Sequence, residues 1–128
     1  MSRGLADTTI FIAHESGRSL HTEILPDEIA VSVITIGELR AGVLAAADTG
    51  TRDRRLATLT SALALEPMPV DDAVAEAWAR LRLLLRDSGQ QMPVNDSWIA
   101  ATAMALRVPI VTQDADYVEI EGLPVIKV

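Results

Sequence analysis

The sequence predicts a single α/β domain over residues 1–128, a three-layer α/β/α arrangement in which helices cover both faces of a mainly parallel sheet. Short apolar runs alternate along the chain with longer segments of helical composition. Several of these runs are continuously apolar, which is typical of strands buried on both faces. No Pro-, Gly- or Ser-rich linker divides the 128 residues, and this length suits one domain.

The first half of the chain is expected to form short strands followed by longer helices. β-branched runs favour strands, and segments rich in Ala, Leu, Glu and Arg favour helices. In chain order we expect a short start RGLAD (3–7), a brief strand passing into a helix in TTIFIAHES (8–16), a helical piece over 20–25 ended by Pro26, a buried strand IAVSV (29–33), and helices over 34–48 and 51–65.

The second half contains the clearest helix, DDAVAEAWARLRLLLRDSG (71–89). It has acids in its first turn, arginines late, and a glycine just past its end. Before it, LEPMPV (65–70) predicts a weak strand whose prolines suit a sheet edge. After it, we expect a helix over 95–108 and short apolar strands over 109–112 and 124–128.

The composition limits the classes of function. The chain has no cysteine, which excludes disulfides, thiolate catalysis and Cys-ligated zinc. No apolar run approaches the roughly 20 residues of a membrane span, and no signal peptide is evident, so a soluble, cytoplasmic protein is expected. The net charge of −7 argues against a nucleic-acid-binding protein, because domains that bind phosphates are usually basic. One Phe, two Trp and one Tyr argue against a base-stacking platform, and both tryptophans are expected in the core or an interface.

Acidic residues are expected to meet at one edge of the sheet. Ligands of such sheets bind outside the carboxyl ends of the strands. Asp7 follows the first strand, and Asp114 and Asp116 follow the strand 109–112. In an extended chain, positions i and i+2 would point these last two carboxylates the same way. Glu38 lies about one turn into a helix that follows a strand, and Asp96 opens a helix that leads back to one.

Each acid could also serve a purely structural role, and taken alone several of these roles are as good as the functional one. The structural roles are an Asx-turn at Asp7, a capping box over Thr35–Glu38, a helix N-cap at Asn95 or Asp96, and solvated turn positions at Asp114 and Asp116.

Carboxylates without cysteine or usefully spaced histidine form an all-oxygen site, which suits Mg²⁺ or Mn²⁺. Such ions activate water, stabilise the leaving oxygen of a phosphodiester and locally invert the negative field. Arginines at the rim would then position the rest of a nucleic-acid backbone. The candidates for this role are Arg40, Arg80, Arg82 and Arg86.

Four segments together resemble the PIN-domain nucleases, and specifically the VapC-type toxins of bacterial toxin–antitoxin pairs. They are ADTTIFIA (6–13), TIGELRAGV (35–43), PVNDSWIAATA (93–103) and IVTQDADY (110–117), and the similarity runs from Asp7 to the final strand. The resemblance implies a small α/β/α fold and a Mg²⁺- or Mn²⁺-dependent endoribonuclease. Such enzymes inhibit translation by cutting RNA, often tRNA or ribosomal RNA.

The resemblance also implies roles for individual residues and partners. Our hypothesis is that Asp7 and Asp96 are the main direct metal ligands. The resemblance implies a VapB-type antitoxin whose C-terminal tail blocks the acidic cleft. It also implies a homodimer and a higher assembly with the antitoxin. The remaining positions are Glu38 and Asp114 as the other two catalytic acids, Asp116 as an auxiliary acid, Thr8 and Thr112 as supporting hydroxyls, and Leu20/Ile24/Leu25 and Leu56/Leu59/Leu63 as contact surfaces or core.

Two alternatives remain open at this point. A receiver-type phosphoacceptor domain also combines an α/β sheet with an acidic Mg²⁺ pocket, although the single Asp at the first strand fits it poorly. A catalytically inactive binding module would use the acids only as caps, and changing Asp96 to Asn would then alter no activity.

Overall fold

The computed structural model describes residues 2–115 and 117–128. Within them the strands form one parallel sheet of four strands in the order β2-β1-β3-β4. At its centre, Leu5 of β1 is in register with Ala30 of β2 on one side and with Ile110 of β3 on the other. The strands are β1 (Arg3–Ala6), β2 (Glu28–Ala30), β3 (Ile110–Thr112) and β4 (Val125–Lys127).

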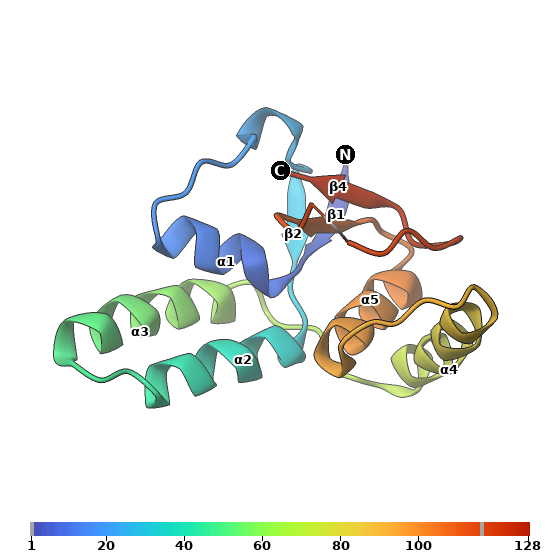
Figure 1. Ribbon diagram of the computed structural model, residues 1–128. Helices are drawn as coiled ribbons and strands as arrows, with labels where there is room; N and C mark the ends of the chain where they lie inside the picture. The colour runs from blue at the N-terminus through green and yellow to red at the C-terminus, as the bar shows by residue number, and fades with distance from the viewer. Residues whose placement is uncertain (1, 116) are drawn as a thin grey trace.

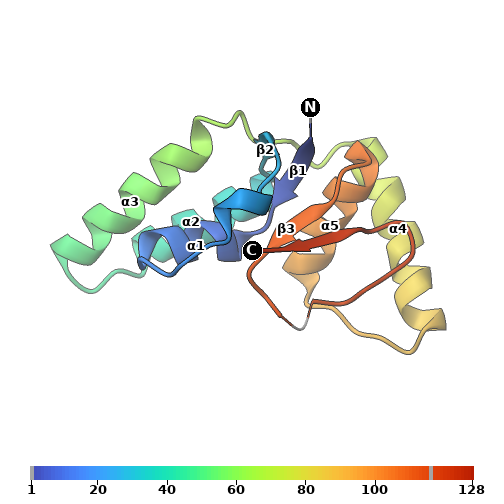
Figure 2. The same ribbon diagram turned by 90° about the horizontal axis from the view of Figure 1, so that it is seen from above.

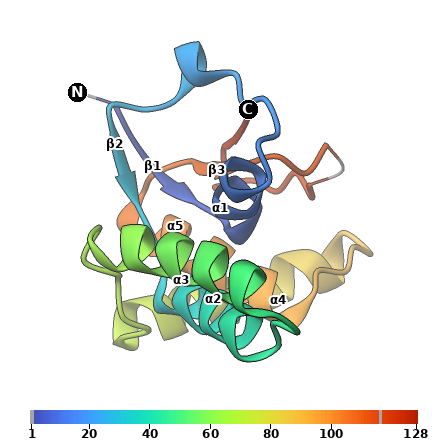
Figure 3. The ribbon, with the colours of Figure 1, turned by 90° about the vertical axis from the view of Figure 1, so that its left-hand side faces the viewer.

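The helices lie on both sides of this sheet, which confirms the α/β/α class (Figures 1 and 2). One side carries α4 and α5, and the other side carries α1. An antiparallel pair, α2 and α3, packs with α1 and projects beyond the sheet (Figure 3). The helices are α1 (Thr8–Glu15), the short 3₁₀ helix η1 (Thr22–Ile24), α2 (Val33–Leu44), α3 (Thr49–Leu63), α4 (Asp72–Asp87) and α5 (Val94–Leu106).

Two apolar clusters hold the layers together. In the larger one, Leu5 and Ile110 from the sheet pack with Leu81 of α4 and Ile99 of α5, and all four are fully buried. Burying each such side chain stabilises the fold by about 1.5–3 kcal/mol relative to leaving it exposed. The smaller cluster joins α2 and α3 and is completed by α1; it contains Ile36, Leu39, Leu59, Ala62, Phe11 and Val43. The edge of the sheet that carries the acids therefore lies between two separately packed halves.

The centre of the sheet leaves no room for a side chain at Gly4. A Cβ built there would lie 2.8 Å from Cγ of Pro26 and 2.8 Å from Cγ2 of Val111. Only glycine fits at this position, because Pro26, just before β2, and Val111 of β3 both come close to β1 there.

The structure corrects three boundaries. The brief strand expected within 8–16 is wrong: the strand is the preceding segment, β1, and α1 begins at Thr8. The strand expected over 29–33 is shorter, because Ser32 caps α2 by accepting a hydrogen bond from the backbone N–H of Ile34 at 3.0 Å. The weak strand at 65–70 reduces to a single bridge between Ser32 and Met68.

Of the helices in the described part of the chain, none has the length and apolar character needed to cross a membrane.

Candidate active site

Asp7 lies at the point where the strand order reverses, between the carboxyl ends of β1 and β3. It is only 5% exposed and caps α1. Its Oδ1 accepts hydrogen bonds from the backbone N–H of Thr9 at 3.0 Å and from Oγ1 of Thr9 at 2.5 Å. Its Oδ2 accepts one from Oγ1 of Thr112 at 2.5 Å. The expected cap role of Asp7 is therefore confirmed, and the same carboxylate is fastened to the neighbouring strand.

The two hydroxyls that hold Asp7 also fix the turn after β3. Oγ1 of Thr9 accepts a hydrogen bond from the N–H of Gln113 at 2.9 Å, and Oγ1 of Thr112 accepts one from the N–H of Asp114 at 3.0 Å. The exposed Asp114 is thereby placed beside Asp7. Because β3 ends at Thr112, the extended geometry expected for the acids at positions i and i+2 does not apply to Asp114.

Glu38 faces the same edge from α2. It is half-buried, and its Oε1 accepts a hydrogen bond from Oγ1 of Thr8 at 2.7 Å. Oγ1 of Thr8 also lies 3.0 Å from Oγ1 of the buried Thr35. The capping-box role of Glu38 is wrong, because Ser32 is the N-cap of α2. The glutamate instead connects α2 to the first turn of α1.

Asp96 lies in the first turn of α5 and is half-buried. The helix begins at Val94 after Pro93, without a side-chain cap, so the N-cap role of Asn95 or Asp96 is wrong. Burial raises the pKa of Asp96, and the negative charges of three other acids raise it further. Those acids are Asp7, Glu38 and Asp114.

Asp7 experiences opposing effects on its pKa. Burial raises the pKa most, the hydrogen bonds from Thr112 and Thr9 lower it, and the charge of Asp114 raises it again. The net direction is upward from the usual aspartate value. Four acids from separate elements thus share one electrostatic environment at the carboxyl edge of the sheet, and this environment opposes negative charge.

Tyr117 is a further polar group at this edge. Its side chain is 8% exposed, and its hydroxyl has no hydrogen-bond partner among the described residues. Burial raises the pKa of the phenol, and so do the charges of Asp7, Asp96 and Asp114. The hydroxyl stays protonated and lies within the electrostatic reach of these acids. Tyr117 was assigned no role from the sequence, although the position of this aromatic residue directly after the acid pair was a signal.

The carboxylate oxygens at this edge are the kind of ligand that a divalent cation prefers. Their arrangement suits such an ion less well. Within residues 2–115 and 117–128, no three acidic or histidine side chains are placed to hold one ion together, so the expected convergence on a shared ion is looser than anticipated. Asp116, the expected auxiliary acid, lies outside these residues. Mg²⁺ is usually held by one or two carboxylates and keeps several waters, which this edge allows. A cation would also neutralise the repulsion that raises the pKa of Asp96.

The four candidate arginines lie at different places. Arg82 and Arg86 are on the part of α4 that packs beside the first turn of α5, where they line a hollow together with Ser97. Arg80 lines a different hollow near the end of α5 and pairs with Glu76 at 2.5 Å. Arg40 is exposed on α2.

Sequence reasoning missed Thr9 and Thr35. Thr9 and Thr112 bond to Asp7, and Thr8 links Glu38 to Thr35, but only Thr8 and Thr112 were expected at this edge. The signal was present for Thr9, because a residue two positions after a helix-capping Asp supplies the N–H that the cap accepts.

Comparisons with known proteins agree with this geometry. The PIN domain family matches residues 5–123. Ribonuclease VapC5 of Mycobacterium tuberculosis is 50% identical over 119 residues, which are 93% of this chain and 88% of that protein. Ribonuclease VapC4 of the same organism is 46% identical over 126 residues, 98% of this chain and 97% of that protein. A crystal structure of VapBC-5, a toxin–antitoxin system of Mycobacterium tuberculosis, superimposes with a TM-score of 0.90 at 44% identity over the full length of both chains. The chain belongs to the PIN domain family, among the relatives of the VapC ribonucleases.

Proposed function

We propose that this chain is a ribonuclease that acts as the toxin of a toxin–antitoxin pair and depends on Mg²⁺, with Mn²⁺ as a substitute. It hydrolyses internal phosphodiester bonds of tRNA or ribosomal RNA and so inhibits translation. The whole of residues 1–128 forms the nuclease domain. The observation that carries the proposal is the shared electrostatic environment of Asp96, Asp7, Glu38 and Asp114 at the carboxyl edge of β1 and β3. The similarity to proteins named VapC ribonucleases supports it.

The roles of the acids follow from how each is held. Asp7 and Asp96 would bind the ion directly, with Glu38 and Asp114 completing its surroundings through water. When bound, the ion supplies an activated water and stabilises the leaving oxygen. Asp116 would assist as an auxiliary acid.

The hydroxyls and the phenol position these groups. Thr9 and Thr112 donate to the carboxylate of Asp7, which favours its ionised form and fixes both of its oxygens. Thr8 holds Glu38 against α1. Tyr117 supplies a buried O–H donor within the electrostatic reach of the acids.

A VapB-type antitoxin is the proposed protein partner, since the similar VapBC-5 structure is one of a toxin–antitoxin system. Its tail would block the acidic edge. A homodimer, assembled further with the antitoxin, is also proposed. Of the two candidate contact surfaces, Leu59 belongs to the core at 3% exposure, whereas Ile24, Leu56 and Leu63 are 49%, 48% and 42% exposed.

The receiver-type alternative is not carried further, because the PIN family match spans residues 5–123. The inactive-module alternative is tested by the same experiment as the nuclease. Purified protein is incubated with total bacterial RNA in Mn²⁺ or in EDTA, and the new 5′ ends are mapped.

Two variants make this experiment specific. Asp96→Asn should abolish the Mn²⁺-dependent ends, while Asp53→Asn, the same change at an exposed position of α3, should leave them unchanged. Equal cleavage by Asp96→Asn and the wild type, or cleavage that persists in EDTA, would reject the proposal.

A further inference from the structure

Two tryptophans distant in sequence form a stack between α4 and α5. The rings of Trp78 (α4) and Trp98 (α5) have centroids 4.4 Å apart and an interplanar angle of 3°. The guanidinium carbon of Arg82 lies 4.9 Å from the centroid of Trp78. Nε1 of Trp78 donates a hydrogen bond to Oγ of Ser97 at 3.0 Å, so the stack is fixed against α5. Both rings remain half-buried, which leaves part of each accessible.

A hollow of about 300 Å³ lies next to this stack. Its size fits the lower end of the range for small-ligand pockets. Its lining includes Arg82, Arg86, Gln90, Gln91 and Ser97, with no acid among the described residues that form it. A chain of net charge −7 therefore carries a local positive site with amide groups that can donate and accept hydrogen bonds.

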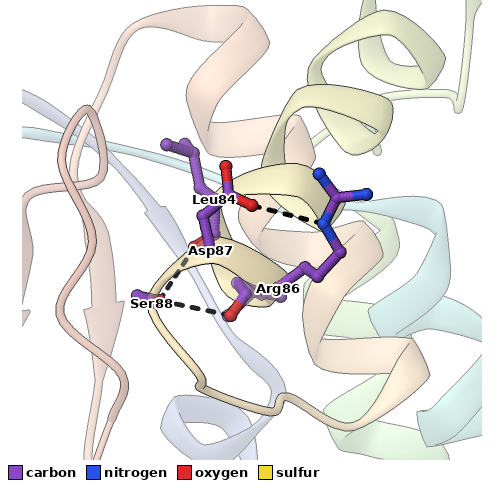
Figure 4. Close-up of polar contacts among 5 residues, drawn as sticks. Leu84, Arg86, Asp87 and Ser88 are labelled. Carbon is purple, nitrogen blue, oxygen red and sulfur yellow. Dashed lines mark hydrogen bonds and ion pairs between the residues drawn. The ribbon is translucent and has the colours of Figure 1, made fainter.

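The end of α4 keeps Arg86 accessible. Figure 4 shows Arg86 beside Asp87 at this end, where Nε lies 3.2 Å from Oδ1 of the aspartate and Oγ of Ser88 donates to the carbonyl of Leu84 at 2.8 Å. The side chains of the ion pair are 72% and 69% exposed. Exposed pairs of this kind contribute about 0–1 kcal/mol, so an arriving phosphate can displace Asp87.

The hollow lies against the first turn of α5, the turn that also carries Asp96. Val94 and Ser97 line the hollow, and Asp96 lies between them in the chain. At about 100° per residue, Asp96 projects from a different side of this turn than Val94 and Ser97, so the hollow and the acid share the turn but not its face.

We propose that the stack of Trp78, Trp98 and Arg82, together with this hollow, is a subsite for single-stranded RNA between α4 and the first turn of α5. A base stacks on the tryptophan pair or on the guanidinium plane, and Arg82 and Arg86 bind backbone phosphates. Proteins recognise unpaired bases by stacking on aromatic rings and arginine planes. This inference rests on the proposed ribonuclease function and adds where its substrate is held. The scarcity of aromatics had argued against such a platform, but the fold brings both tryptophans together.

Tryptophan fluorescence gives a direct test, because the chain has only these two tryptophans. A short oligoadenylate is titrated into the full-length protein in EDTA, where no cleavage occurs, while emission and oligonucleotide anisotropy are both recorded. Saturable quenching that tracks the anisotropy is expected. If the anisotropy rises and the emission does not change, RNA binds elsewhere and the subsite is wrong.

Charge variants test the two arginines. The double variant Arg82→Gln/Arg86→Gln should bind about tenfold or more weakly, and its log–log salt slope should fall by about 1.4. The matched control Arg52→Gln/Arg107→Gln removes the same charge at two exposed positions outside the hollow and should bind like the wild type. If both double variants bound RNA equally weakly, the effect would come from overall charge and the inference would be overturned. Arg82→Lys should keep the salt slope but quench less, since the planar group is lost.

An antitoxin titration and a cleavage assay complete the test. If purified antitoxin quenches the tryptophans and RNA does not, the surface is a protein interface and the RNA subsite is rejected. In Mn²⁺, the double variant Arg82→Gln/Arg86→Gln should cleave RNA with a raised KM. Wild-type protein that binds the oligonucleotide as expected but cleaves no RNA would reject the ribonuclease proposal while leaving the subsite standing.

Discussion

Replacing Thr112 with Val tests whether the buried hydroxyl network holds Asp7 in place. The change keeps the side-chain shape and removes the O–H that donates to Oδ2 of Asp7 at 2.5 Å and accepts from the N–H of Asp114 at 3.0 Å. A hydrogen bond to a charged group contributes about 1.5–3 kcal/mol. The free energy of unfolding should therefore fall by about 2 kcal/mol, and Tm by roughly 4–8 °C for a chain of this length.

The pH dependence of this loss distinguishes it from a packing defect. The hydrogen bond from Thr112 lowers the pKa of Asp7 against the raising effect of burial, so its removal moves the pKa further up. Because the pKa of Asp7 is then higher in the folded than in the unfolded state, the variant loses stability as pH rises through that folded value. The difference between wild type and variant should be largest near pH 8 and should shrink toward acid pH, where the carboxyl is protonated in both.

Urea unfolding at several pH values measures the effect, with Thr102→Val as the matched control. Thr102 is equally buried, but its hydroxyl donates to the backbone carbonyl of Trp98 and touches no acid. A smaller, pH-independent change is expected there. If Thr112→Val were as stable as the wild type, or if both variants lost the same free energy at every pH, the hydroxyl would not stabilise an ionised Asp7.

Three further predictions concern the acids and the sheet. Asp96→Asn should raise Tm at pH 7.5 without metal and flatten its fall with rising pH, because burial and like charges raise the folded-state pKa of Asp96 and make its ionised form unfavourable. Mn²⁺ at a hundredfold excess over its dissociation constant should stabilise the wild type by about 2.7 kcal/mol and Asp96→Asn much less, as differential scanning fluorimetry would show. Gly4→Ala should lower the free energy of unfolding by about 1–3 kcal/mol through its contacts with Pro26 and Val111, whereas Gly37→Ala, which meets nothing within 4 Å, should raise it by about 0.5–1 kcal/mol. Equal effects of the two glycine changes would contradict the packing described for β1.

The layer order and most helices could be predicted from the sequence, because apolar runs and helical composition are local signals. The boundaries of the elements were predicted less well. The segment TTIFIA has β-branched and aromatic residues that favour a strand, yet Asp7 caps it and α1 starts at once. The residues 29–33 are uniformly apolar except Ser32, and that serine ends the strand by capping α2. In both cases a single cap overrode the propensity of its neighbours.

The site was predicted as a set of acids, and in the structure two of them, Asp7 and Glu38, are held by threonine hydroxyls. Asp7, Glu38, Asp96 and Asp114 could be placed at one edge because parallel strands share that edge. Thr35 could not, since its contact with Thr8 depends on how α2 packs against α1, which no spacing rule encodes. For Thr9, the spacing from the capping Asp7 predicts the backbone contact, but not the bonds that its hydroxyl makes to Asp7 and to the N–H of Gln113. The pairing of Trp78 with Trp98 depends in the same way on how α4 packs against α5.

The bond between Asp7 and Thr112 spans 105 positions, so Asp7 is synthesised well before its partner. At about 5–20 residues per second, a ribosome needs roughly 5–20 s to travel between them. Throughout that interval the emerging polypeptide possesses its first acid but lacks β3, the central strand that completes the sheet beside it. A growing chain therefore cannot fasten Asp7 to the neighbouring strand until Thr112 has been made.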